Sequence, residues 1–217
     1  MYPNAYNGIK KIFTAEVLSL ISALIGVFAA IVAVVGLQHV DTGAEDIGSA
    51  SAFVGGGLVL IISGIVAIVA FILKIVGVSN AAVDEPNFKK ASSWILAGIV
   101  CSIATSMTTD GTLLHLAASV LYTVCQLYVT MYVIDGVCSL ADKIGRTDFA
   151  QKGAKIKNLI LVAYIISLVI TIIQGFLPES GTTTVISGIL AVVSLIVIVI
   201  MYYMYLKLLS EGKKMLA

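Results

Sequence analysis

Side chains that form hydrogen bonds recur at helical spacing along one apolar stretch of the chain, residues 111–134. They are His115, Ser119, Tyr122, Gln126 and Thr130. Because each residue advances an α-helix by about 100°, these spacings confine the five side chains to about 60° of a helix circumference. Donors and acceptors on one face of a helix could bind a small solute, a lipid or an ion by hydrogen bonding.

Two neighbouring apolar stretches carry similar polar stripes. One stripe consists of Gly98, Ser102, Thr105, Ser106 and Thr109, and the other of Tyr164, Ser167, Thr171 and Gln174. Polar groups within lipid face the interior of a helix bundle or a water-filled cavity, so the three stripes predict a shared polar interior that binds or transports a ligand. The alternative is that these groups only bond one another across helix contacts, at roughly 0.6 kcal/mol each.

Signatures of catalysis and metal binding are missing from the sequence. It contains no HExxH, P-loop, GxSxG or CxxC motif, and its two histidines are His39 and His115. Cys101, Cys125 and Cys138 have no metal-ligand spacing, which predicts three small packing residues. We therefore expect no catalytic residue, no metal and no cofactor, and a protein that is not an enzyme.

The elements that carry these stripes must be helices in a membrane. Hydrophobic residues make up 59% of the chain and charged residues only 12%, against about 25% charged in soluble proteins. A net charge of +1 leaves no basic surplus for a nucleic-acid partner. The stretches without Asp, Glu, Lys or Arg that are long enough to cross a bilayer as helix are 17–40, 47–73, 91–109, 111–134, 158–178 and 180–206.

This pattern predicts an all-α, polytopic membrane protein with a bundle of six transmembrane helices. Hydroxyl groups dilute the stretch 91–109, so the alternative is that it joins 111–134 in one re-entrant hairpin. The first stretch is too long for the apolar region of a signal peptide, which spans roughly 7–15 residues. We therefore expect it to be a retained helix.

The charged residues between the apolar stretches predict the orientation. All 13 Lys and Arg residues fall on one side, and that side also holds seven acidic residues, so its net charge is 13 − 7 = +6. The opposite loops contain only Asp41, Glu45, Asp46, Asp110 and Glu179, a net charge of −5. Since short cytoplasmic loops retain Lys and Arg, we expect a plasma-membrane protein with both termini in the cytoplasm.

The chain reads as one integral membrane domain, 1–217, made of three tandem hairpins at about 8–82, 87–142 and 147–210. Each hairpin begins with a residue that can cap a helix, followed by a bulky apolar residue and lysine; the predicted capping residues are Asn7, Asn87 and Thr147. An aromatic belt near the predicted cytoplasmic ends consists of Trp94, Tyr132, Tyr202, Tyr203 and Tyr205. Duplication of one hairpin explains this repeat. The alternative explains it equally well: any hairpin of this kind needs a helix cap and a basic anchor.

Small residues at intervals of four predict close helix packing, because they let helix backbones approach. One ridge is Ser22, Gly26 and Ala30, and a second is Ala163, Ser167, Thr171 and Gly175. Gly55, Gly56 and Gly57 predict a further close contact or, alternatively, an unwound segment that coordinates a ligand. The first ridge could instead face a second copy of the chain or another membrane protein.

The segment Asp84-Glu85-Pro86-Asn87-Phe88-Lys89-Lys90-Ala91 resembles a linker in uncharacterised multi-span membrane proteins of Gram-positive gut bacteria. The resemblance implies a multi-span fold and no known activity.

Two classes of function follow from these patterns. The first is binding or transport of a small solute, lipid or ion through the polar interior. The second is a membrane-embedded accessory or scaffold subunit that acts through helix contacts and has no ligand. The polar stripes on three successive helices favour the first.

Overall fold

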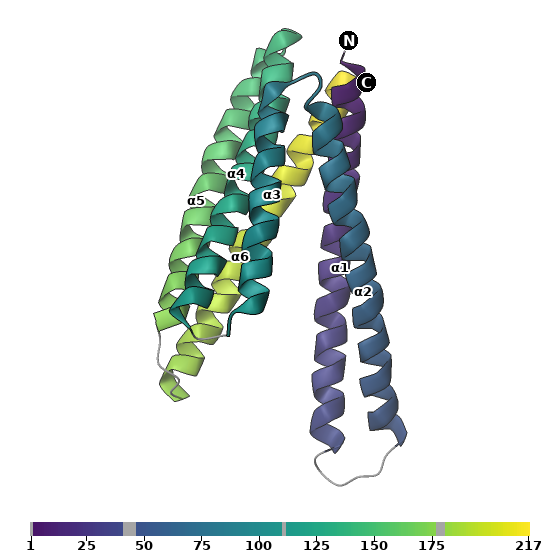
Figure 1. Cartoon of the computed structure of the whole chain (residues 1–217), viewed down its shortest axis with the longest axis vertical. Coiled ribbons are helices and arrows are strands. Elements are labelled where there is room, and N and C mark those ends of the chain that lie inside the picture. The colour runs from purple at the N-terminus through teal and green to yellow at the C-terminus, as the bar shows by residue number, and fades with distance from the viewer. Residues whose placement is uncertain (1, 41–46, 110–111, 177–180) are drawn as a thin grey trace. The chain divides into compact units, whose positions relative to one another are not determined.

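The computed structural model describes residues 2–40, 47–109, 112–176 and 181–217, and the side chains of all of these except 33–40, 47–56, 174–176 and 181–195. The described residues form six α-helices and no strand (Figure 1). The helices are α1 (Pro3–Val40), α2 (Ile47–Ala81), α3 (Pro86–Met107), α4 (Leu113–Lys143), α5 (Thr147–Phe176) and α6 (Gly181–Leu216). The prediction of an all-α fold is confirmed.

Five of the described helical segments are long and apolar enough to cross a membrane. They are Pro3–Val32, Gly57–Ala81, Pro86–Met107, Leu113–Lys143 and Thr147–Ile173. Since α3 and α4 are separate helices of 22 and 31 residues, each suffices for one crossing, which favours two crossings over a re-entrant hairpin. The crossing by α6 and the orientation of the termini stay predictions.

The chain divides into two compact units. Unit 1 consists of Met1–Lys10 and Gly77–Ala217, and unit 2 of Lys11–Val76. In unit 1, α4 packs against α3, α5 and α6, and α5 packs against α6. The expectation of one domain spanning 1–217 stays a prediction.

The core of unit 1 lies at one end of its helices, which we call the basic end and define by the turns 82–85 and 144–146. The largest side chains buried there without exposure include Phe88, Ile134, Val137, Leu140 and Leu208. At the opposite end the helix surfaces are open: Met107 is 81% exposed and Leu113 74%. Apolar side chains with such exposure are stable in contact with lipid.

Glycines allow the helices to approach closely at the basic end. A Cβ atom at Gly136 of α4 would lie 2.5 Å from Cε2 of the buried Phe88 ring, and one at Gly8 of α1 would lie 2.5 Å from the carbonyl oxygen of Gly77. A Cβ atom at Gly153 would overlap the Cys138 side chain in the same way, and one at Gly212 would overlap the Val137 side chain. These four contacts join α1 to α2, α4 to α3, α5 to α4 and α6 to α4, and the small-residue pattern in the sequence did not identify them.

Two helix starts in unit 1 differ from the predicted caps, whereas α5 begins at the predicted residue, Thr147. Glu85, rather than Asn87, caps α3, because its carboxylate accepts a hydrogen bond from the backbone N–H of Asn87. Asn7 lies inside α1, which begins at Pro3. The turn after α4 contains Gly145 in the left-handed region at φ 79°, where glycine meets no steric penalty from a side chain.

Unit 2 is a helical hairpin held by two serines. The Ser22 hydroxyl of α1 donates to the Ser63 carbonyl of α2, and the Ser63 hydroxyl donates to the Ser22 carbonyl, both at 2.7 Å. Gly26 packs one turn further along, since a Cβ atom there would lie 3.3 Å from Ser63 Oγ. Ala30 is exposed, and the buried residue at this level is Ala29.

The other predicted packing residues are placed as follows. A Cβ atom at Gly57 would meet nothing within 4 Å, so among the described residues Gly57 makes no close helix contact. Ala163, Ser167 and Thr171 of α5 are half-buried. Gly55, Gly56 and Gly175, together with Gln174, lie outside the residues whose surroundings the structure describes.

Candidate functional site

The polar stripe of α4 follows the side of the helix that is turned toward its neighbours. Thr130 is buried, donates its hydroxyl to the Gln126 carbonyl at 3.0 Å, and lies 3.4 Å from the Tyr164 hydroxyl of α5. Gln126 is half-buried beside α3, with Nε2 3.8 Å from the position that a Cβ atom on Gly98 would take. Gln126 and Thr130 are therefore near α3 and α5 respectively.

Residues of this side are buried near the basic end and become exposed at Ser102 of α3 and Tyr122 of α4. On α3, Phe88, Ala91, Ile95 and Gly98 are buried at helical spacing, but Ser102, one turn further, is exposed. On α4 the change is the same: Thr130 is 8% exposed and Tyr122 is 38% exposed. Ser102 continues the face of Phe88, Ala91, Ile95 and Gly98 on α3, so its exposure is not a rotation to another face of the helix. On α4, Cys125 and Ala118 stay buried on a neighbouring face.

We use the name polar face for five polar side chains of α3 and α4 that lie farther from the basic end than Gly98 and Thr130. They are Ser102, Thr105, Ser119, Tyr122 and Gln126, of which Ser102 and Tyr122 are exposed and the others half-buried. His115 is half-buried at the far end of α4, with Nδ1 3.3 Å from the Thr108 hydroxyl.

Threonine hydroxyls of the stripes bond to their own helices. Thr105 donates to the Cys101 carbonyl at 2.9 Å, and Thr171 donates to the Ser167 carbonyl at 3.0 Å. Each hydroxyl has one proton, so these groups offer a ligand only the acceptor lone pairs of their oxygen atoms. In the part of the chain that the structure describes, the Gln126 amide has no hydrogen-bond partner, so it keeps donors and an acceptor for a ligand or for water.

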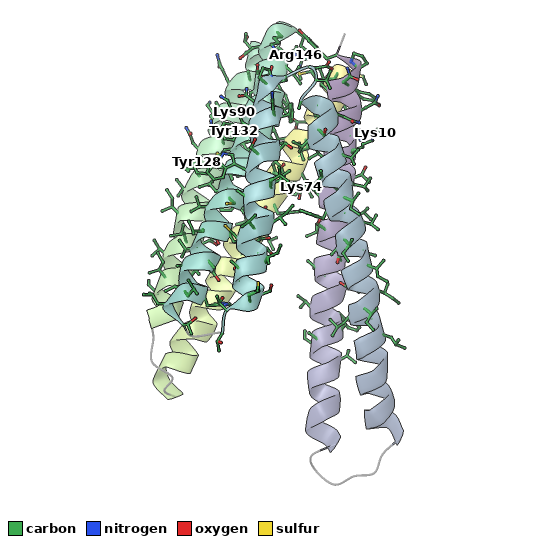
Figure 2. The ribbon with its side chains drawn as sticks, in the orientation of Figure 1. Lys10, Lys74, Lys90, Tyr128, Tyr132 and Arg146 are labelled. Carbon is green, nitrogen blue, oxygen red and sulfur yellow. The ribbon has the colours of Figure 1, made fainter. Side chains whose placement is uncertain are left out.

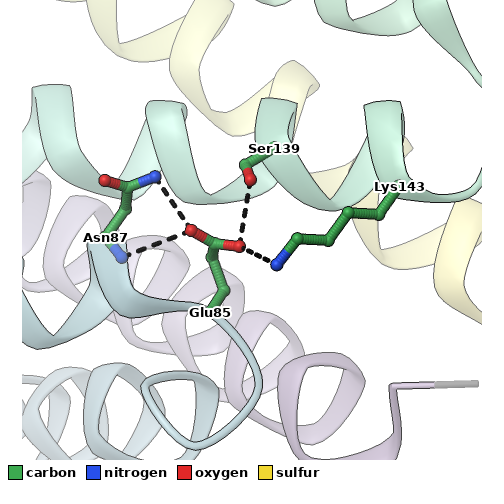
Figure 3. Close-up of polar contacts among 4 residues, drawn as sticks. All are labelled: Glu85, Asn87, Ser139 and Lys143. Atoms are coloured by element: carbon green, nitrogen blue, oxygen red, sulfur yellow. Dashed lines mark hydrogen bonds and ion pairs between the residues drawn. The ribbon is translucent and has the colours of Figure 1, made fainter.

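A second polar centre, which sequence reasoning did not identify as a site, lies at the basic end (Figure 3). The Glu85 side chain is buried, and its Oε2 accepts hydrogen bonds from Ser139 at 3.0 Å and from Lys143 Nζ at 2.6 Å. Its Oε1 accepts from Asn87 Nδ2 at 2.9 Å. One carboxylate thereby joins the start of α3 to the last turns of α4.

The pKa of Glu85 reflects this network. Burial by itself raises the pKa of the carboxyl, but the hydrogen bonds from Lys143, Ser139 and Asn87 act in the opposite direction and hold it below its ordinary value. The neighbouring Asp84 accepts hydrogen bonds from the Ala5 backbone N–H at 2.8 Å and from Asn4 Nδ2 at 3.1 Å. Both acidic residues of the segment Asp84–Ala91 therefore accept hydrogen bonds from the first turn of a helix, Asp84 from α1 and Glu85 from α3.

Aromatic rings form a ladder along α3 and α4 near the same end. Trp94 stacks on Tyr128 with ring centroids 4.3 Å apart, and Tyr128 lies 6.2 Å from Tyr132. The Lys90 ammonium is 5.6 Å from the centroid of the Tyr132 ring. Figure 2 shows Lys90, Tyr132 and Tyr128 following one another along this side. The belt predicted from the sequence included Trp94 and Tyr132 but not Tyr128.

An ion pair joins the two helices of unit 2. Lys74 Nζ lies 2.8 Å from Glu16 Oε1, and Glu16 is 4% exposed. Glu16 directly precedes the apolar stretch 17–40, so the sequence placed it among the acidic residues of the loops. The helix α1 instead continues through it, and Glu16 is an acidic side chain within a candidate membrane span.

Among the residues that the structure describes, no group of three or more His, Cys, Asp or Glu side chains is arranged to hold a metal ion. The sequence matches no protein-family model, and no curated protein and no solved structure is significantly similar to it.

Proposed function

We propose that the chain is a non-enzymatic integral protein of the plasma membrane that crosses the bilayer six times, with both termini in the cytoplasm, and that binds or transports a small polar solute, lipid or ion at the polar face. The apolar helices support membrane insertion. The charge difference between the two sides of the chain supports the orientation.

The observation that carries the proposal is the change of exposure between Gly98 and Ser102. The face of α3 is fully packed up to Gly98 and then opens where its side chains become polar. An exposed hydroxyl within a candidate membrane span is unfavourable against lipid, so water or a ligand is the more favourable neighbour. Gln126, which lies beside Gly98 with its amide unbonded among the described residues, adds both a donor and an acceptor at this level.

The residues of the polar face are uncharged, which bears on the ligand. Hydroxyl and amide groups fix a ligand through hydrogen bonds and do not neutralise a full charge. A neutral polar solute, or an ion that binds together with its counterion, suits this set of side chains better than a multiply charged anion.

The test is whether water reaches the polar face. In a chain whose native cysteines are replaced by alanine, Ser102→Cys should react with a charged, water-soluble thiol reagent, because thiolate forms only in contact with water. Val100→Cys is the matched control: it lies two residues away on α3, is 67% exposed, and should face lipid and stay unreacted. Equal protection of both positions would overturn the proposal.

A second candidate function is that of an accessory or scaffold subunit that works through helix contacts. The threonine hydroxyls that donate to their own helix backbones favour it, because such groups need no ligand. Under this alternative a partner helix or a second copy of the chain covers the polar face. Ser102→Cys would then be protected in the assembled protein and become reactive once the partner is removed.

A further inference from the structure

The aromatic ladder carries a cation at one end and continues into apolar surface at the other. Lys90 is exposed and lies over Tyr132, and Tyr128 is 40% exposed beyond it. Leu121 and Leu114 stand seven and fourteen residues before Tyr128 on α4, and are 56% and 66% exposed. Because seven residues make about two helical turns, these three side chains lie along one side of the helix.

The spacing of these groups matches the parts of a phospholipid. From Tyr128 to Leu114 the helix rises about 21 Å, at about 1.5 Å per residue. That length exceeds one half of a hydrocarbon core about 30 Å thick, so an acyl chain that begins at the rings has apolar side chains beside it throughout. The rings stand between this surface and the ammonium group, at the level where aromatic residues meet lipid headgroups.

The charge at the headgroup end determines which headgroup fits. A lysine that lies over a ring still directs N–H groups away from it, and these can donate to a phosphate. Tyrosine hydroxyls can donate to phosphate or ester oxygens. The Tyr132 ring could by itself attract the ammonium group of a choline headgroup. The like charge of Lys90 over that ring would instead repel it.

We propose that Lys90, Tyr132, Tyr128 and Trp94 bind the headgroup and glycerol region of one anionic phospholipid, with an acyl chain along Leu121 and Leu114. The site is separate from the polar face, and it depends neither on the proposed transport function nor on which leaflet the basic end faces. It requires only that α3 and α4 lie in a membrane.

The experiment compares lipid retention by the full chain. The protein is purified in mild detergent, incubated with phosphatidylglycerol or with phosphatidylcholine of the same acyl chains, and the bound lipids are counted by native mass spectrometry. We expect the wild-type chain to retain phosphatidylglycerol preferentially. Lys90→Gln should reduce that preference about fivefold, the effect of one lysine on attraction to anionic lipid, and Lys90→Arg should keep it.

Lys155→Gln is the matched control, because Lys155 is an exposed lysine on α5 away from the ladder, and it should keep the preference. Tyr128→Leu should weaken retention of phosphatidylglycerol while helicity and the size-exclusion profile stay unchanged. The proposal is overturned if Lys90→Gln keeps the preference, or if Lys155→Gln loses it equally, which would indicate general surface attraction. Displacement of the lipid by millimolar inorganic phosphate would also overturn it, because the site would then bind a free anion.

Discussion

The carboxylate of Glu85 lies 2.6 Å from the ammonium group of Lys143, although 58 residues separate them in the chain. Glu85 precedes α3 and Lys143 is the last residue of α4, so the pair closes the basic end of the α3–α4 hairpin. The Glu85 side chain is 4% exposed and that of Lys143 is 41% exposed. The buried carboxylate therefore depends on this network, while the lysine also reaches solvent.

Glu85→Gln should destabilise the protein by about 1–3 kcal/mol, because the change removes a charged acceptor of hydrogen bonds from four donor groups of three residues. Thermal unfolding in detergent measures the effect. The matched control is Asp148→Asn, which removes a pair with Arg146 in which both side chains are exposed and should leave the unfolding temperature nearly unchanged. Equal effects of the two changes would contradict a special role for Glu85.

The stability of the protein should depend on pH through Glu85. Folding lowers its pKa, so the carboxylate contributes fully above its ordinary pKa of about 4.3 and loses this contribution as the pH falls through the lower, folded value. We expect the unfolding temperature of the wild-type chain to fall below about pH 4.3. Glu85→Gln should show a smaller decrease over the same interval, and parallel curves for the two proteins would exclude Glu85 as the titrating group.

Gly136→Ala should destabilise unit 1 by about 1–3 kcal/mol, because the new methyl group overlaps the Phe88 ring, which is fully buried. Gly64→Ala is the control, since a Cβ atom there meets nothing within 4 Å. Alanine favours helix over glycine by about 1 kcal/mol, so the control should be neutral or slightly stabilising. Chemical denaturation of both variants measures the difference.

The two serines of unit 2 should show a measurable coupling. Each hydroxyl donates its only proton to the carbonyl of the other residue, so we expect a coupling energy of about 0.6 kcal/mol and at most about 1.7 kcal/mol. A double-mutant cycle of Ser22→Ala and Ser63→Ala determines it. Ser106→Ala should have little effect, because the exposed Ser106 hydroxyl bonds within its own helix; a larger loss there than at Ser22 would argue against the serine contact.

The orientation can be tested at two exposed positions on opposite sides of the predicted membrane. In a chain without native cysteines, Thr109→Cys should react with an impermeant thiol reagent applied to intact cells, because Thr109 follows the end of α3 that is predicted to face outward. Gln151→Cys, in the first turns of α5, should react only after lysis. The reverse pattern would invert the topology and leave the fold unchanged.

The sequence by itself determined that this chain forms long apolar helices and predicted where most of them lie. An apolar run in lipid must satisfy its backbone hydrogen bonds within its own segment, so the helix is specified locally. The sequence did not distinguish which residue caps α3, since Asn87 and Glu85 are both polar residues near the helix start. Only the turn geometry places the Glu85 carboxylate on the first backbone N–H groups.

Tertiary structure decided which residues meet. Helical periodicity shows which side chains share a face, but not which neighbour that face contacts or how closely. Ser22 and Gly136 are both small residues in apolar helices, and the sequence singled out only the first; the position of Phe88 from another helix makes the second a contact point. The exposure of Ser102 and Tyr122 on the polar face likewise depends on where the neighbouring helices lie, and the order of residues within one helix does not determine it.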